Sequence, residues 1–225
     1  MRLIHSTTAL WVLALAVSMP THGAQVWTEG VNYFLVQPVR TPSVPQGKVE
    51  VTEVFSYACP ACNIFQPTMH KLKQAMPANV VVDYLPAAFN PGEDWPMFQL
   101  AYVTAQILGV ADQWHDAMFD AVWKGGDLSI TDASHGLKTH MPTIEDAAKF
   151  YNQHAGVPVE KFIATSKSFS ADLKVRTDED LIAGYKVDRT PTIIVNGKYR
   201  LHVESAGGPD QLIDLVKYLV AKETK

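Results

Sequence analysis

Apolar and polar residues alternate from Val49 to Tyr57, and this two-residue period predicts a β-strand. One face of the strand would carry Val49, Val51, Glu53, Phe55 and Tyr57. The spacing becomes helical from Pro60 to about Met76, with Pro67 expected to kink the helix, and a second strand is predicted at Val80–Leu85. A strand, helix and strand in this order predict parallel strands joined by a right-handed crossover.

Only helical periods follow, from Asp94 to about Tyr185. Thr143 and Asp146 form a capping-box pattern that opens one helix, and a further helix is expected from Pro158 to about Arg176. This block separates the first two strands from the remaining ones. We therefore expect a helical subdomain at residues 94–186, inserted into a domain made of residues 25–93 and 187–225.

Strand patterns return at Thr192–Val195 and at Tyr199–Val203. Between them, Asn196-Gly197 predicts a two-residue hairpin turn, and a last helix is expected from about Pro209 to Lys222. The order of elements favours an α/β fold with a mixed central sheet flanked by helices.

The first 24 residues have the pattern of a secretory leader. Arg2 precedes the apolar run Ala9–Val17, which is too short to span a bilayer, and small residues follow near Gly23 and Ala24. We expect cleavage near residues 23–24. The alternative is an uncleaved membrane anchor, but no stop-transfer run follows. Export would place the protein in an oxidising compartment.

Composition narrows the possible functions. Hydrophobic residues make up 47% of the 225 residues and charged ones 19%, which is typical of a globular protein rather than a disordered one. The formal charge is −4 and no basic cluster is interleaved with aromatic residues, so the sequence argues against nucleic-acid binding.

The chain contains two cysteines, Cys59 and Cys62. A bridge between them would close almost no loop and would add little stability, so a structural disulfide does not explain the pair. A zinc site would need a second pair of ligands, and only His135 and His140 are loosely spaced for that role. We therefore expect no metal site and a chemical role for the cysteines.

Cys59 stands where the first strand gives way to a helix, beside unpaired N–H groups at the helix N-terminus. These donors stabilise a thiolate, which favours the reduced form and makes the pair an oxidant of other thiols. Cys62 lies nearly one turn further along the same side, where it can resolve a mixed disulfide on Cys59. The pattern indicates thiol-disulfide exchange, with the cysteine pair itself as the only redox group.

Glu53 and Thr190-Pro191 each allow two interpretations. Glu53 could be a partly buried carboxyl with a raised pKa that exchanges a proton with Cys62, or a carboxylate reaching solvent at a strand edge. Pro191 directly precedes the third strand, where an ordinary trans peptide is the common form.

These residues together resemble the DsbA family of periplasmic thiol:disulfide interchange proteins, which have a thioredoxin fold with a helical insertion. The resemblance rests on Cys59-Pro60-Ala61-Cys62 after a strand, Glu53 six residues before Cys59, the helical block, and Thr190-Pro191-Thr192 opening a later strand. It implies a nucleophilic Cys59, a resolving Cys62, a buried acidic Glu53, and a cis Pro191 facing the active site beside Thr190.

Ala61 departs from the best-known members of that family, which carry His at this position. The alanine side chain cannot donate a hydrogen bond to the thiolate. We therefore expect Cys59 to be less acidic, and the protein to be a weaker oxidant, than those members.

The resemblance implies an oxidase in the periplasm. It would pass its disulfide to unfolded or reduced exported proteins and would be reoxidised by a membrane quinone reductase of the DsbB type. The alternatives are a reductase or isomerase of the same fold, or a non-enzymatic peptide-binding chaperone. Similar isomerases carry an N-terminal dimerisation domain, and the short segment before Val49 favours a monomer instead.

Overall fold

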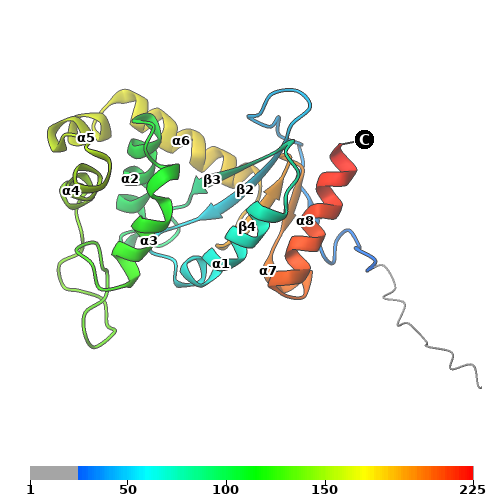
Figure 1. The fold of residues 1–225 in the computed structure, drawn as a ribbon, viewed down its shortest axis with the longest axis horizontal. Coiled ribbons are helices and arrows are strands. Elements are labelled where there is room, and N and C mark those ends of the chain that lie inside the picture. Colours follow the sequence, from blue (N-terminus) through cyan, green and yellow to red (C-terminus); the bar gives the residue numbers. More distant parts are fainter. Residues whose placement is uncertain (1–24, 225) are drawn as a thin grey trace, which may run out of the picture.

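A central five-stranded sheet organises the chain (Figure 1). The computed structural model describes residues 25–224, so the predicted leader lies outside the described residues. The strands are β1 Phe34–Leu35, β2 Val49–Phe55, β3 Val80–Pro86, β4 Thr192–Val195 and β5 Tyr199–Leu201. Their order in the sheet is β1-β5-β4-β2-β3, with β2 and β3 parallel and the other pairs antiparallel. The predicted mixed sheet is confirmed.

The strand β2 is an inner strand, and every one of its residues is buried. It ends at Phe55, so the predicted end at Tyr57 is wrong by two residues. The reason is a turn held by Ser56, whose carbonyl accepts from the Cys59 N–H at 3.1 Å and whose hydroxyl accepts from the Ala58 N–H at 3.2 Å. This turn leads directly into the first helix.

Helices cover both faces of the sheet. They are α1 Pro60–Ala75, α2 Trp95–Ile107, α3 His115–Trp123, α4 Ile144–Ala155, α5 Val159–Ser166, α6 Phe169–Gly184, α7 Val203–Ala206 and α8 Pro209–Glu223, with short 3-10 turns at Pro91–Glu93 and Asp112–Trp114. In Figure 1, α2 to α5 form a group beside the sheet, while α1 and α8 lie across it. Because α2 to α6 all fall between β3 and β4, we retain residues 94–186 as a proposed subdomain.

Two hydrophobic clusters correspond to the two faces. Val51 and Phe55 of β2 pack in the larger one, with α1, α8 and the helical group, whereas Val54 packs in the smaller one with Ile182 of α6. Alternate residues of β2 therefore enter different clusters, which explains why the whole strand is buried. No helix within residues 25–224 is long and apolar enough to cross a membrane.

Two local predictions need correction. The helix expected from Pro158 to Arg176 is two helices, α5 and α6, because Ser168 starts a new helix by accepting from the Ala171 N–H at 3.2 Å. The strand expected to reach Val203 ends at Leu201, and α7 begins instead. The helix α1 continues through Pro67, and the kink expected there stays a prediction.

The predicted hairpin between β4 and β5 is confirmed. Asn196 and Gly197 both have left-handed backbones, with φ of 54° and 62°, as a type I′ turn requires. A Cβ on Gly197 would lie 2.3 Å from the carbonyl oxygen of Arg40, so this position also needs glycine for space. The N-terminal segment is thus packed closely against the hairpin.

Candidate active site

Cys59 caps the N-terminus of α1. Its sulfur accepts a hydrogen bond from the backbone N–H of Cys62 at 3.3 Å, and Pro60 fills the first helical position, where no N–H is needed. The side chain of Cys59 is almost fully covered, with 4% exposed, while Pro60 and Ala61 are exposed beside it. The structure therefore places Cys59 at the start of α1, where the sequence predicted it, with its sulfur just beneath the surface.

The surroundings of Cys59 favour its thiolate. A hydrogen bond from the Cys62 side chain is the largest influence, and together with Thr190 and the backbone of Cys62 and Ala61 it lowers the pKa of Cys59 to about 6, against the opposing effect of burial. A thiol with this pKa is mostly ionised at neutral pH. Ala61 contributes to this only through its backbone N–H.

Thr190 faces the active-site sulfur from the opposite side of the site. Its carbonyl oxygen lies 3.6 Å from the Cys59 sulfur, and the Thr190–Pro191 peptide is cis, as the resemblance implied. The hydroxyl of Thr190 is buried and has no hydrogen-bond partner among the described residues. It is therefore free to turn toward the sulfur when Cys59 loses its proton.

Cys62 differs from Cys59 in burial and acidity. Its side chain is 0% exposed, and burial raises its pKa well above the usual range for a thiol. Both cysteines are free thiols in this structure. The pair thus combines an acidic outer sulfur with an inner sulfur that holds its proton.

Glu53 lies under the cysteines in the middle of the sheet. It pairs with Tyr84 of β3 and Ile193 of β4, its side chain is 0% exposed, and neither carboxyl oxygen has a hydrogen-bond partner among the described residues. Burial raises its pKa well above the usual value, with Lys73 opposing the shift and Cys59 adding to it. The interpretation of Glu53 as a solvent-reaching edge carboxylate is wrong, because β2 is an inner strand.

The helical group also braces the turn before Cys59. The hydroxyl of Tyr57 is 3.0 Å from Nδ1 of the buried His115 on α3, and the Trp123 indole N–H donates to the carbonyl of Tyr57 at 2.8 Å. Sequence reasoning missed His115 and Trp123. Their only sequence signal was an ordinary helical period, which does not distinguish a bracing residue from a core residue.

A metal role finds no support in the geometry. Within residues 25–224, no group of three or more His, Cys, Asp or Glu side chains is close enough to hold an ion. The absence of a metal from the cysteine pair stays a prediction.

Comparison with known proteins gives a consistent result. The family model for the DSBA-like thioredoxin domain matches residues 50–219. The chain is similar to the thiol:disulfide interchange protein DsbA of Pseudomonas aeruginosa, with 35% identity over 217 residues that cover 96% of this chain and 94% of that protein. The protein of the same name from Pseudomonas syringae is 33% identical, with the same coverage.

Solved structures agree with the sequence relatives. The crystal structure of Pseudomonas aeruginosa DsbA has a TM-score of 0.72 at 34% identity, and covers 88% of this chain and 94% of that one. The oxidoreductase DsbA from Xylella fastidiosa also gives a TM-score of 0.72, at 27% identity, with 85% and 95% covered. Since the family match spans most of the chain, this protein belongs to the DSBA-like thioredoxin domain family of thiol:disulfide oxidoreductases.

Proposed function

We propose that this protein is a periplasmic oxidase that donates the Cys59–Cys62 disulfide to reduced exported proteins. The observation that carries the proposal is the contrast between the two sulfurs, since the pKa of Cys59 is lowered to about 6 while that of Cys62 is raised. A stabilised Cys59 thiolate favours the reduced enzyme. An enzyme whose reduced form is favoured gives its disulfide away.

The exchange takes place in two steps. A substrate thiolate attacks Cys59 of the disulfide, the bond between Cys59 and Cys62 breaks, and Cys62 leaves as a thiolate that takes up a proton. A second substrate thiolate then attacks the substrate sulfur of the mixed disulfide, and Cys59 leaves as a thiolate. The substrate loses two electrons and gains a disulfide, and the enzyme ends with one thiolate and one thiol.

Glu53 is the proposed source of the proton for Cys62. Its charge raises the pKa of Cys62, neither of its carboxyl oxygens has a hydrogen-bond partner among the described residues, and burial raises its own pKa well above the usual value. A buried carboxyl with a raised pKa holds its proton to a higher pH than an exposed one, which suits it to general acid catalysis at a leaving thiolate. The charge that Cys62 would otherwise hold in the interior is thereby removed.

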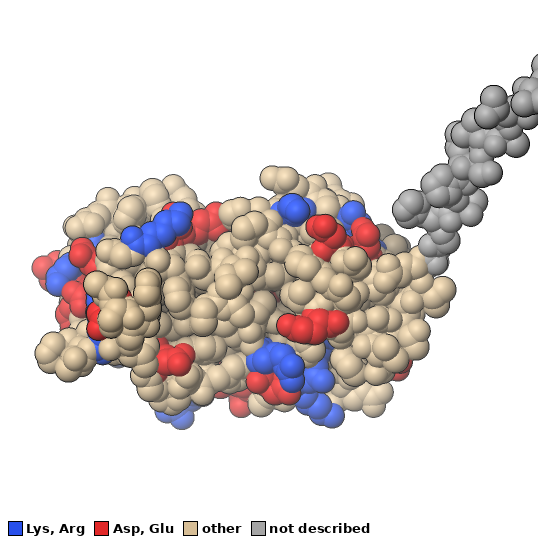
Figure 2. Space-filling view, turned by 90° about the horizontal axis from the view of Figure 1, so that it is seen from below, with Lys and Arg blue, Asp and Glu red and all other residues tan. Residues whose placement is uncertain are grey.

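The surface at the site fits a polypeptide substrate. Ile64, two residues beyond the second cysteine, is 78% exposed, and Ala61 is exposed one helical turn before it, so apolar side chains border the reactive sulfur. On the face shown in Figure 2, acidic and basic side chains are scattered among larger uncharged areas. Unfolded chains expose apolar segments of varied sequence, which such a surface can contact without strict selection.

The predicted leader supports the periplasmic location, and the family supports reoxidation by a membrane quinone reductase of the DsbB type. We propose that the mature protein works as a monomer. No cofactor besides the cysteine pair is needed for either step of the exchange.

The test is the equilibrium of the mature protein with defined mixtures of reduced and oxidised glutathione, followed by alkylation and mass measurement. A reduction potential well above that of glutathione would support the oxidase. A potential near or below it would refute the oxidase and indicate a reductase or isomerase. A Cys59→Ala variant that still protects unfolded proteins from aggregation as well as the wild type would indicate a binding module instead.

A further inference from the structure

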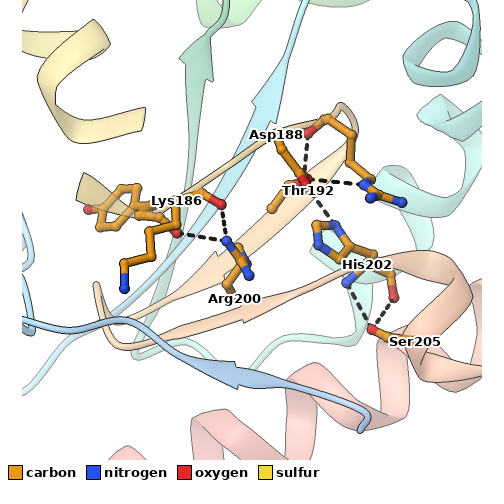
Figure 3. A network of polar contacts seen from close by, with 8 residues as sticks. Lys186, Asp188, Thr192, Arg200, His202 and Ser205 are labelled. Carbon is orange, nitrogen blue, oxygen red and sulfur yellow. Dashed lines mark hydrogen bonds and ion pairs between the residues drawn. The ribbon is translucent and has the colours of Figure 1, made fainter. Parts of the chain in front are cut away.

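A chain of hydrogen bonds leads from β5 to the peptide that adjoins Thr190. His202 follows β5, and its Nδ1 lies 3.0 Å from the hydroxyl oxygen of Thr192, which in turn donates to the carbonyl of Arg189 at 2.7 Å (Figure 3). Thr192 is 0% exposed and directly follows Pro191. The chain of bonds therefore ends one residue before the group that faces the active-site sulfur.

The direction of these bonds follows from the protons available. The Thr192 hydroxyl has a single proton, and donation to the Arg189 carbonyl uses it. The contact with His202 is then a hydrogen bond only if Nδ1 of His202 carries a proton and donates to the Thr192 oxygen. Burial lowers the pKa of His202, and Arg189 and Arg200 lower it further, so the neutral ring with its proton on Nδ1 is the form that satisfies both contacts.

The backbone of His202 is itself fixed from α7. Its N–H donates to the hydroxyl of Ser205 at 3.2 Å (Figure 3). The side-chain amide of Asn32 donates to the Ser205 carbonyl at 2.9 Å. The side chain of Arg189 takes no part in this network and forms an ion pair with Asp188 at 3.1 Å. Arg189 joins the network through its backbone carbonyl, which accepts from Thr192.

The other end of the same connection is held by β5 as well. Residues 185–191 join α6 to β4, and the guanidinium of Arg200 donates to the carbonyls of Tyr185, at 3.3 Å, and of Lys186 (Figure 3). Arg200 of β5 and His202, which directly follows that strand, thus hold the two ends of the connection. The connection that carries Thr190 is therefore held by hydrogen bonds at its start, near Lys186, and next to Thr190, at Arg189.

We propose that His202 and Thr192 are positioning residues that hold Thr190 against Cys59 and thereby set how strongly the cysteine pair oxidises other thiols. The inference rests on the proposed oxidase function. It adds to the active site two residues that do not contact the Cys59 sulfur. It depends on where the hydrogen-bond chain holds residue 190, whose carbonyl oxygen lies 3.6 Å from the Cys59 sulfur and whose side chain lowers the pKa of Cys59. Loosening the chain would withdraw the Thr190 side chain, which favours the thiolate of Cys59.

The first test is Thr192→Val, which keeps the buried shape and removes the hydroxyl. The expected result is an equilibrium constant for oxidising glutathione that is about 3- to 10-fold smaller, with the pKa of Cys59 raised by about half a unit to one unit, which corresponds to one ordinary hydrogen bond. The thiolate absorbance at 240 nm gives the pKa, and glutathione mixtures give the equilibrium constant.

The matched control is Thr104→Val on α2. Thr104 is also 0% exposed, and its hydroxyl donates to the Leu100 carbonyl at 2.7 Å, so the substitution removes a similar bond far from the cysteines in sequence. Both variants are expected to lower the melting temperature by about 2 to 6 °C. Only Thr192→Val is expected to move the equilibrium constant and the pKa. Equal values for the two variants would overturn the proposal.

The second test compares two replacements of His202. In His202→Asn the side-chain N–H₂ can donate from nearly the same place as Nδ1, so wild-type redox values are expected. His202→Leu cannot donate and should reproduce the effect of Thr192→Val. The double variant should be no worse than either single one, since both break one chain of bonds; additive effects would contradict the mechanism.

The tests of this proposal and the test of the oxidase function can fail independently of each other. If the wild-type potential proves too low for an oxidase, the oxidase proposal fails, yet the pKa of Cys59 in each variant still reports whether His202 and Thr192 position Thr190. If the potential is high and the variants leave it unchanged, the oxidase proposal stands and the positioning proposal fails.

Discussion

Replacing Cys59 with serine is expected to remove a pH-dependent part of the free energy of unfolding of the reduced protein. Serine can still accept the hydrogen bond that Cys62 N–H makes to the helix cap at 3.3 Å, so the cap itself is retained. The hydroxyl does not ionise between pH 5 and 9. The substitution therefore isolates the contribution of the thiolate.

The size of the effect follows from the two pKa values. The Cys59 thiol has an ordinary pKa of about 9 when unfolded and about 6 when folded. Between these values the unfolded chain binds one more proton than the folded chain, so stability rises by about 1.4 kcal/mol per pH unit and by about 4 kcal/mol in all. Water that reaches the sulfur reduces this to about 2 to 4 kcal/mol.

The sign is fixed by the lowered pKa. The stabilisation is complete above pH 9 and is lost as the pH falls through 6. Urea unfolding of both proteins, with a reductant present, at intervals from pH 5 to pH 9 gives the difference in free energy at each pH. Subtracting the variant cancels most other titrating groups. A difference that stays constant across this range would refute the assignment of a stabilised thiolate to Cys59.

Three further substitutions test other parts of the site and fold. Glu53→Gln should slow thiol-disulfide exchange roughly 100-fold or more by removing the proton donor. The variant should also become more stable than the wild type as the pH rises above about 4.5, because the raised pKa makes the folded wild type retain a proton that its unfolded chain loses. Exchange rates and urea unfolding against pH check both expectations, and unchanged profiles would rule out the role. Ala61→His should lower the pKa of Cys59 and raise the equilibrium constant for oxidising glutathione about 3- to 10-fold, since the imidazole ring adds a hydrogen-bond donor near the sulfur. An equilibrium constant equal to that of the wild type would count against this expectation. Gly197→Ala should lower the free energy of unfolding, measured in urea, by about 2 to 4 kcal/mol, because its Cβ would meet the Arg40 carbonyl at 2.3 Å. Gly109→Ala, with open space around the Cβ and a similar φ of 72°, should lower it by about 1 kcal/mol. Equal losses would show that the left-handed backbone, and not the contact with Arg40, sets the cost at Gly197.

The sequence predicted the parts of the site that depend on neighbours along the chain. The change of period after Tyr57 placed Cys59 at the start of a helix, and Asn196-Gly197 specified the hairpin turn that the structure contains. These features are set by local backbone preferences, so a single stretch of sequence is enough to reveal them.

The depth of Glu53 could not be predicted in this way. Whether β2 lies inside the sheet or at its edge depends on β4, which joins it from about 140 residues later in the chain. The same limit applies to His202 and Thr192, whose link is a contact between two short strands and their ends. The two-residue strand β1 and the four-residue helix α7 were missed because elements so short show no period.

The contact between Cys59 and Thr190 joins residues that are 131 positions apart. A chain that is still emerging from N-terminus to C-terminus therefore carries both cysteines well before the segment that completes their environment. Until the residues from Thr190 onward have folded, the Cys59 sulfur therefore has its hydrogen bond from α1 but lacks the contact with Thr190. The thiolate of Cys59 is correspondingly less favoured during that interval.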